Sequence, residues 1–149
     1  MQNANTVVPI APLTRGHSFL FSELADSYMA CYRGRDSNLN TRLRFFVERL
    51  GDKVASQIDG DDIQDCLDSL QQRGCLHNRG RNKGGNICPT GKPLANGTIN
   101  RYRCAIQAVL SWARRKRLMP KGWANPVNET ERLPEENVRT RFLNSEEYA

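Results

Sequence analysis

Apolar residues recur at intervals of three and four in four stretches of this 149-residue chain. That spacing places them on one face of an α-helix, whereas a half-buried strand would show strict alternation. We expect helices over residues 18–33, 38–50, 59–73 and 98–117. Ser18 and Asp59 are suited to cap the first and third of these helices. The pattern predicts an all-α bundle of four to five helices, with a small core because only 38% of the residues are hydrophobic.

A long connection over residues 74–97 separates the third and fourth helices. It is rich in glycine, asparagine and basic residues, and Gly84-Gly85 and Thr90-Gly91 are turn signals. Connections of this length inside a compact domain are usually functional or disordered. We therefore expect a long basic loop or a small hairpin before the last, longest helix.

Charge is strongly segregated along the chain. Residues 69–128 contain twelve Lys and Arg side chains and no Asp or Glu, whereas residues 1–68 carry seven basic and ten acidic side chains. Residues 129–149 carry three basic and six acidic side chains. A block of positive charge suits a polyanion, and DNA or RNA is the commonest such partner because each neutralised phosphate releases counterions. The alternative interpretation is a solvated basic surface.

The fourth predicted helix carries a polar stripe opposite its apolar face. The stripe consists of Asn100, Arg103, Gln107, Ser111 and Arg114, at spacings of three and four. Asn and Gln pair with adenine, Arg pairs with guanine, and an α-helix fits the major groove. Basic residues of the preceding loop suit phosphate contacts, which position the protein without reading sequence. An exposed helix face that is polar only because it meets water is the other interpretation, and the lack of balancing acids disfavours it. The candidate DNA-binding residues are Arg42, Arg44, Arg81, Lys83, Lys92, Asn96, Thr98, Asn100, Arg101, Arg103, Gln107 and Arg114.

The sequence shows no arrangement that predicts catalysis or a cofactor. His17 and His77 are the only histidines, and no nucleophile triad, phosphate loop or dinucleotide fingerprint is present. Cys75, His77 and Cys88 provide three potential zinc ligands without a standard spacing, so we predict no metal site. Capping of the third helix explains the acidic cluster over residues 59–65 better than a calcium site does.

Two further expectations concern the cysteines and the location of the protein. Cys31, Cys66 and Cys104 fall within helical patterns, so we interpret them as reduced packing residues. The apolar run at residues 7–13 is too short and too proline-rich for a signal peptide or a membrane span. We expect an intracellular, cytoplasmic protein with neither a membrane partner nor a small-molecule substrate.

Several short motifs follow one another in the order of a known family. They are FSELADSY (21–28), LGDK (50–53) with IDGDDI (58–63), NGTINRY (96–102), LSWARR (110–115) with NP (125–126), and RTRFLNSEEY (139–148). In order and spacing they resemble the core-binding, SAM-like helical domain of phage-type integrases, the tyrosine site-specific recombinases. The last motif is similar to the segment that opens the catalytic domain of that family.

The resemblance implies a DNA-binding domain that grips the core recombination site with its second and fourth helices and the basic loop. A following domain would cleave and rejoin strands without a cofactor, through an Arg, a His-x-x-Arg and a nucleophilic Tyr. This chain stops before those residues, and Tyr148 lies only in the opening segment. We expect a non-catalytic fragment: a disordered tail (1–17), a helical core-binding domain (18–127), and a linker with the start of a truncated catalytic domain (128–149).

The implied partners are double-stranded DNA and further protomers of the same recombinase, in a bacterial cell or a phage-infected host. Two other functions are compatible with the residues. The chain is alternatively a free-standing helical DNA-binding regulator, or a helical protein-interaction module whose basic face meets an acidic protein.

Overall fold

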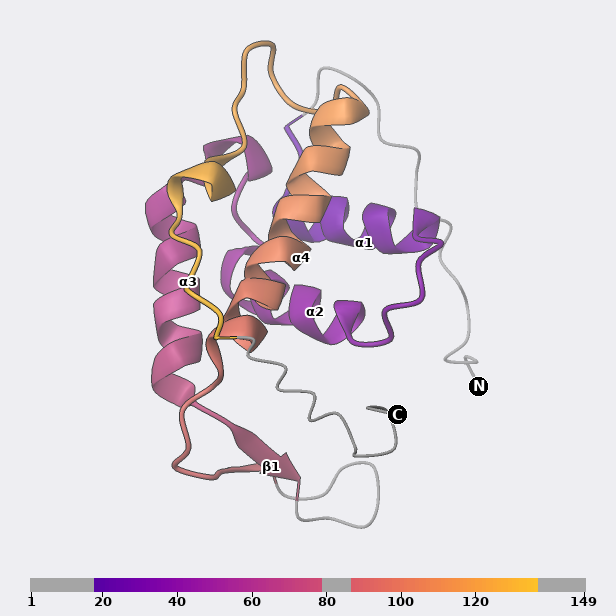
Figure 1. Cartoon of the computed structure of the whole chain (residues 1–149). Coiled ribbons are helices and arrows are strands. Elements are labelled where there is room, and N and C mark those ends of the chain that lie inside the picture. The colour runs from indigo at the N-terminus through magenta and orange to yellow at the C-terminus, as the bar shows by residue number, and fades with distance from the viewer. Residues whose placement is uncertain (1–17, 79–86, 137–149) are drawn as a thin grey trace, which may run out of the picture.

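In the computed structural model, which describes residues 18–78 and 87–136, the chain is mostly helical with one small sheet. The helix α4 contacts the other three α-helices, and Figure 1 shows it crossing α1 and α2 with α3 alongside. The elements are α1 (Phe21–Cys31), α2 (Leu39–Leu50), the 3₁₀ helix η1 (Ala55–Gln57), α3 (Gly60–Arg73), β1 (Leu76–Asn78), β2 (Ile87–Pro89), α4 (Asn96–Arg115) and the 3₁₀ helix η2 (Pro126–Glu129). The largely helical character predicted from the spacing is confirmed.

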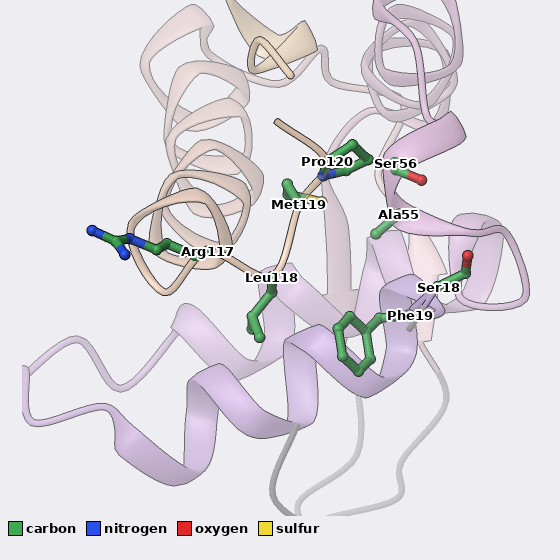
Figure 2. A pocket seen from close by; sticks show the side chains of 8 residues that line it. All are labelled: Ser18, Phe19, Ala55, Ser56, Arg117, Leu118, Met119 and Pro120. Carbon is green, nitrogen blue, oxygen red and sulfur yellow. The ribbon is translucent and has the colours of Figure 1, made fainter. Parts of the chain in front are cut away.

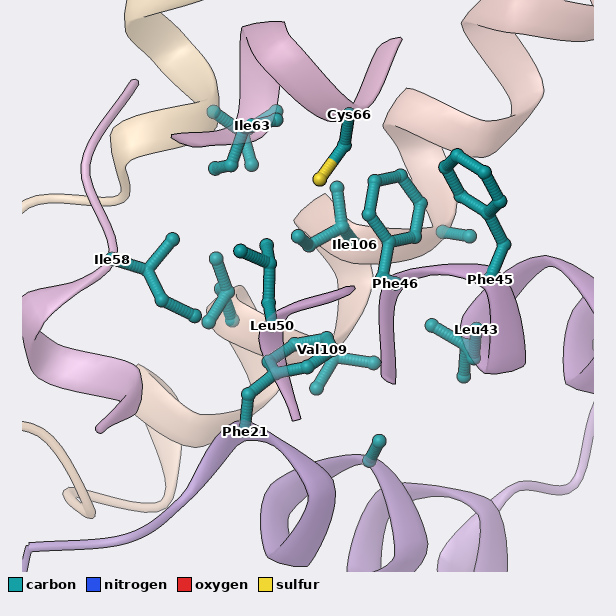
Figure 3. Close-up of a cluster of buried hydrophobic side chains, with 14 of the residues drawn as sticks. Phe21, Leu43, Phe45, Phe46, Leu50, Ile58, Ile63, Cys66, Ile106 and Val109 are labelled. Atoms are coloured by element: carbon teal, nitrogen blue, oxygen red, sulfur yellow. The ribbon is translucent and has the colours of Figure 1, made fainter. Parts of the chain in front are cut away.

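A single apolar cluster joins the four α-helices (Figure 3). Phe21, Phe46, Ile63 and Ile106 are fully buried in it, as their positions on the predicted apolar faces require. Burying one such side chain stabilises the fold by about 1.5–3 kcal/mol. Phe45 is also buried.

The start of α1 differs from the prediction because residues 19–21 pair with the segment before η1. Phe21 N–H donates to Lys53 O (3.0 Å) and Ala55 N–H donates to Phe19 O (2.8 Å). This pairing keeps the backbone extended up to Leu20, so Ser18 is not the N-cap. The Glu23 carboxylate instead accepts the Leu20 N–H at 2.8 Å, which satisfies a donor at the helix start.

The start of α3 matches the prediction. Asp59 accepts the Asp62 N–H (2.8 Å), and the Asp62 side chain accepts the Asp59 N–H (3.2 Å), which together form a capping box. Asp62 also accepts a hydrogen bond from the Lys53 ammonium, and this bond lowers the pKa of the Asp62 carboxyl. The acidic cluster at residues 59–62 is therefore accounted for by helix capping and an ion pair.

The helix ends differ in how they use the left-handed backbone region. Gly74 ends α3 with φ 68°, and a side chain there would meet Lys92 O at 2.6 Å, so glycine is required. Gly51, the glycine that follows α2, stays in the right-handed region with φ −58°. After α4 the left-handed residue is Arg117 (φ 58°), and Leu118 N–H donates to Ala113 O at 3.0 Å. This closure ends α4 two residues before the predicted boundary.

Of the two alternatives left open for this connection, a basic loop or a small hairpin, the hairpin is present as two three-residue antiparallel strands, with His77 opposite Cys88. Thr90 N–H donates to Cys75 O (3.0 Å) and Cys75 N–H donates to Lys92 O (2.9 Å), so the hairpin base is joined to the end of α3. Leu76 and Ile87 are exposed on it. Arg81 and Lys83, two candidate DNA contacts, lie outside the described residues, as do the tail at 1–17 and the motif at 139–148.

The cysteines only partly follow the expectation. Cys66 is buried in the core, and burial raises the pKa of its thiol to about 11. Cys31 and Cys104 are exposed, so the interpretation of these two as packing residues is wrong. In the part of the chain that the structure describes, no helix is both long enough and apolar enough to cross a membrane.

Candidate nucleic-acid interface

The polar stripe of α4 is covered by a later part of the same chain. We call residues 125–135 the C-terminal strap; in Figure 1 it is the yellow segment that returns beside α3 and α4. Asn100 is only 4% exposed. Its Nδ2 donates to Leu133 O (2.8 Å) and Glu135 Oε1 (2.7 Å), and its Oδ1 accepts the Leu133 N–H (3.0 Å). The amide therefore cannot pair with an adenine in this conformation.

Arg103 and Asn96 hold the strap in the same way. The Arg103 guanidinium donates to Thr130 Oγ1 (2.9 Å), Val127 O (3.0 Å) and Thr130 O (3.2 Å). Asn96 Nδ2 donates to Pro134 O at 2.9 Å. These bonds satisfy carbonyl groups of a segment that has little regular structure of its own. The prediction that Asn96, Asn100 and Arg103 face DNA is thus corrected, because their side chains face the strap.

Toward the end of α4 the stripe becomes more open. Asn125, buried in the strap, donates to Ser111 Oγ (3.0 Å) and to the Gln107 carbonyl (3.4 Å). Gln107 and Arg114 line a polar hollow of about 380 Å³ with asparagines of the strap. Arg114 is exposed in this hollow and is the stripe residue best able to reach a phosphate.

The strap also changes the charge of this face. The sequence shows no acid between residues 69 and 128, but the strap brings the Glu135 carboxylate onto Asn100 at 2.7 Å. The lack of acids on the stripe was the reason for disfavouring a helix face that is polar only because it meets water. In the folded chain this reason no longer holds, because the Glu135 carboxylate lies on the polar stripe although it is distant from it in the sequence.

Two of the candidate arginines meet in a groove between α1, α2 and α4. The groove has a volume of about 460 Å³, and Arg42 and Arg101 line it together with Tyr28 and Tyr32. Arg42 Nη1 donates to Asp36 Oδ2 at 2.6 Å, and the Arg42 side chain is 13% exposed. The hydrogen bond from the Asn38 backbone N–H and the nearby arginines lower the pKa of the Asp36 carboxyl.

The arginines of α2 do not share one outer face of the helix. Arg44 is exposed, and it lies two residues from Arg42, which is about 200° around the helix axis. Arg42, Phe45 and Arg49 have the spacing i, i+3, i+7, so they share a face. The Arg49 guanidinium lies over the Phe45 ring, 4.9 Å from the centroid.

Arg73, from the end of α3, reaches the same ring at 5.7 Å. We call Arg42, Arg49, Arg73 and Arg101 the α2 arginine cluster. Sequence reasoning missed Arg49 and Arg73 as candidates. The i, i+4 pair of Phe45 and Arg49 was a legible signal, whereas nothing in the sequence places Arg73 beside α2.

The remaining candidates lie apart from this cluster. Lys92 is exposed in the turn after β2, and Thr98 is half-buried in the first turn of α4. The basic run at residues 114–117 is exposed at the far end of α4. A second hollow, of about 270 Å³, lies there between the start of α1, η1 and the turn after α4 (Figure 2). Its walls include Phe19, Met119 and Arg117, and Figure 2 shows the Arg117 side chain extending away from the other two.

Within residues 18–78 and 87–136 no group of three or more His, Cys, Asp or Glu side chains is placed to hold a metal ion. His77 and Cys88 are cross-strand neighbours, but Cys75 donates instead to the Pro93 carbonyl at 3.4 Å.

Comparison of the chain with protein-family models, with curated proteins and with solved structures gives no match.

Proposed function

We propose that this domain binds double-stranded DNA through the α2 arginine cluster. We further propose that it is the SAM-like core-binding domain of a phage-type tyrosine recombinase. The motif order along residues 21–148 supports the family assignment, and the helical architecture is compatible with it.

One observation carries the DNA-binding proposal. Guanidinium groups from three different helices lie along α2, two at the Phe45 ring and two in the groove between α1, α2 and α4. Arginine binds phosphate oxygens through parallel N–H groups and is the usual residue for such contacts. A surface of this kind positions a protein on the DNA backbone without by itself reading the base sequence.

In this proposal the domain grips one side of the core recombination site. A catalytic domain that follows the strap would cleave and rejoin strands, with further protomers on the same DNA and with no cofactor. Asn100 on α4 donates to Leu133 of the strap, and Asn125 of the strap donates to Ser111 on α4. Both asparagines belong to the motifs that carry the resemblance, and their bonds fix the path that the linker takes along α4.

A fluorescence-anisotropy titration with a duplex of about thirty base pairs tests the proposal. If four arginines each neutralise one phosphate, a plot of log affinity against log salt has a slope of about −3.6. Absence of binding at low salt would contradict the proposal and would favour an acidic protein as the partner of the basic surface.

A further inference from the structure

An anion already occupies the groove between α1, α2 and α4. The Asp36 carboxylate accepts the Asn38 backbone N–H (3.0 Å) through Oδ1 and the Arg42 guanidinium (2.6 Å) through Oδ2. Arg101 lines the same groove and acts on Asp36 electrostatically. The place where this carboxylate lies is therefore built to hold negative charge.

Asp36 is the more exposed partner of this ion pair, with 40% of its side chain exposed against 13% for Arg42. It lies in the exposed connection between α1 and α2, and it is the one carboxylate among the described residues that line the groove. Arg42, by contrast, is held along α2 with most of its side chain covered. A largely covered guanidinium needs an anionic partner, whereas an exposed carboxylate loses little when it turns to water.

We propose that Asp36 is an intramolecular competitor that holds the place of a DNA backbone phosphate on Arg42 and Arg101. This inference rests on the proposed DNA-binding function. A phosphodiester offers the same pair of charged oxygens as a carboxylate, so it can take over the bond from Arg42. Binding then requires displacement of Asp36, which lowers affinity for DNA in general and reduces the net release of counterions at this contact.

Asp36→Asn tests the inference, because asparagine keeps the acceptor for the Asn38 N–H while it removes the charge. The matched control is Asp65→Asn, which removes an exposed charge from α3, a helix that contributes no residue to the groove. Both variants and the unaltered protein are titrated with the same duplex at several salt concentrations. Thermal melting by circular dichroism checks that each variant is folded.

The expected result for Asp36→Asn is a dissociation constant lower by about three- to tenfold at fixed salt. Its log–log salt slope should be steeper by up to about 0.9, equivalent to one further phosphate contact, and the slope of Asp65→Asn should be unchanged. Equal affinities and slopes for the two variants would overturn the inference while DNA binding stands. If no variant binds duplex at low salt, the proposed function fails and the inference fails with it.

Discussion

Replacing Asn100 with alanine is expected to lower the free energy of unfolding by about 2–3 kcal/mol. The amide makes three hydrogen bonds, two of them to the N–H and C=O of Leu133. Alanine would leave those strap groups without their partner, and such partly buried polar groups are costly to leave unpaired. Urea denaturation followed by circular dichroism measures the change.

Gln107→Ala is the control on the same side of α4. Among the described residues its side chain donates one hydrogen bond, to Asn128 Oδ1, which is long at 3.5 Å and exposed, so its loss should cost under about 0.5 kcal/mol. An Asn100→Ala variant as stable as Gln107→Ala would contradict the account of the strap. Proteolysis should also cut Asn100→Ala faster than the unaltered protein at Arg132, which is exposed on the strap.

The double variant Arg42→Gln, Arg101→Gln is expected to weaken binding to duplex DNA by about ten- to a hundredfold at low salt. Two phosphate contacts would be lost, and the salt slope should become shallower by about 0.9 to 1.8, the smaller value applying where Asp36 is displaced on binding. Glutamine keeps a polar head group at the largely covered position of Arg42, so the fold should persist, and thermal melting by circular dichroism checks this.

Its control is Arg44→Gln, Arg132→Gln, which removes the same charge. Arg44 lies on another side of α2, and Arg132 lies on the strap with 73% of its side chain exposed. Comparable losses of affinity in the two double variants would mean that overall charge, and not the α2 arginine cluster, governs binding.

Features set by local sequence were predictable. The Asp59 cap, the Gly74 stop and the apolar faces of the helices each depend on residues within one or two turns. Turn residues close in sequence made the hairpin one of two expectations for the connection before α4. The start of α1 was not predictable, because distant residues around Lys53 hold the backbone extended there.

The polar stripe of α4 shows why the candidate site was only partly predictable. A helix face that meets water and one that meets an irregular segment are both polar, because the backbone of such a segment also needs hydrogen-bond partners. Asn100 and Leu133 are 33 residues apart, and no periodicity in the sequence connects them. Arg42 and Arg101 were identified individually, but their shared groove depends on the packing of three helices.

The central claim, that duplex DNA binds over the groove of Arg42 and Arg101, is tested most directly by cysteine protection. Cys104 is exposed and lines this groove, whereas Cys31 is exposed on α1 and does not line it. Alkylation at each cysteine is followed by peptide mass spectrometry, with and without saturating duplex. Bound DNA is expected to slow the alkylation of Cys104 and to leave the alkylation rate of Cys31 unchanged. Equal rates at Cys104 with and without bound DNA would contradict the central claim.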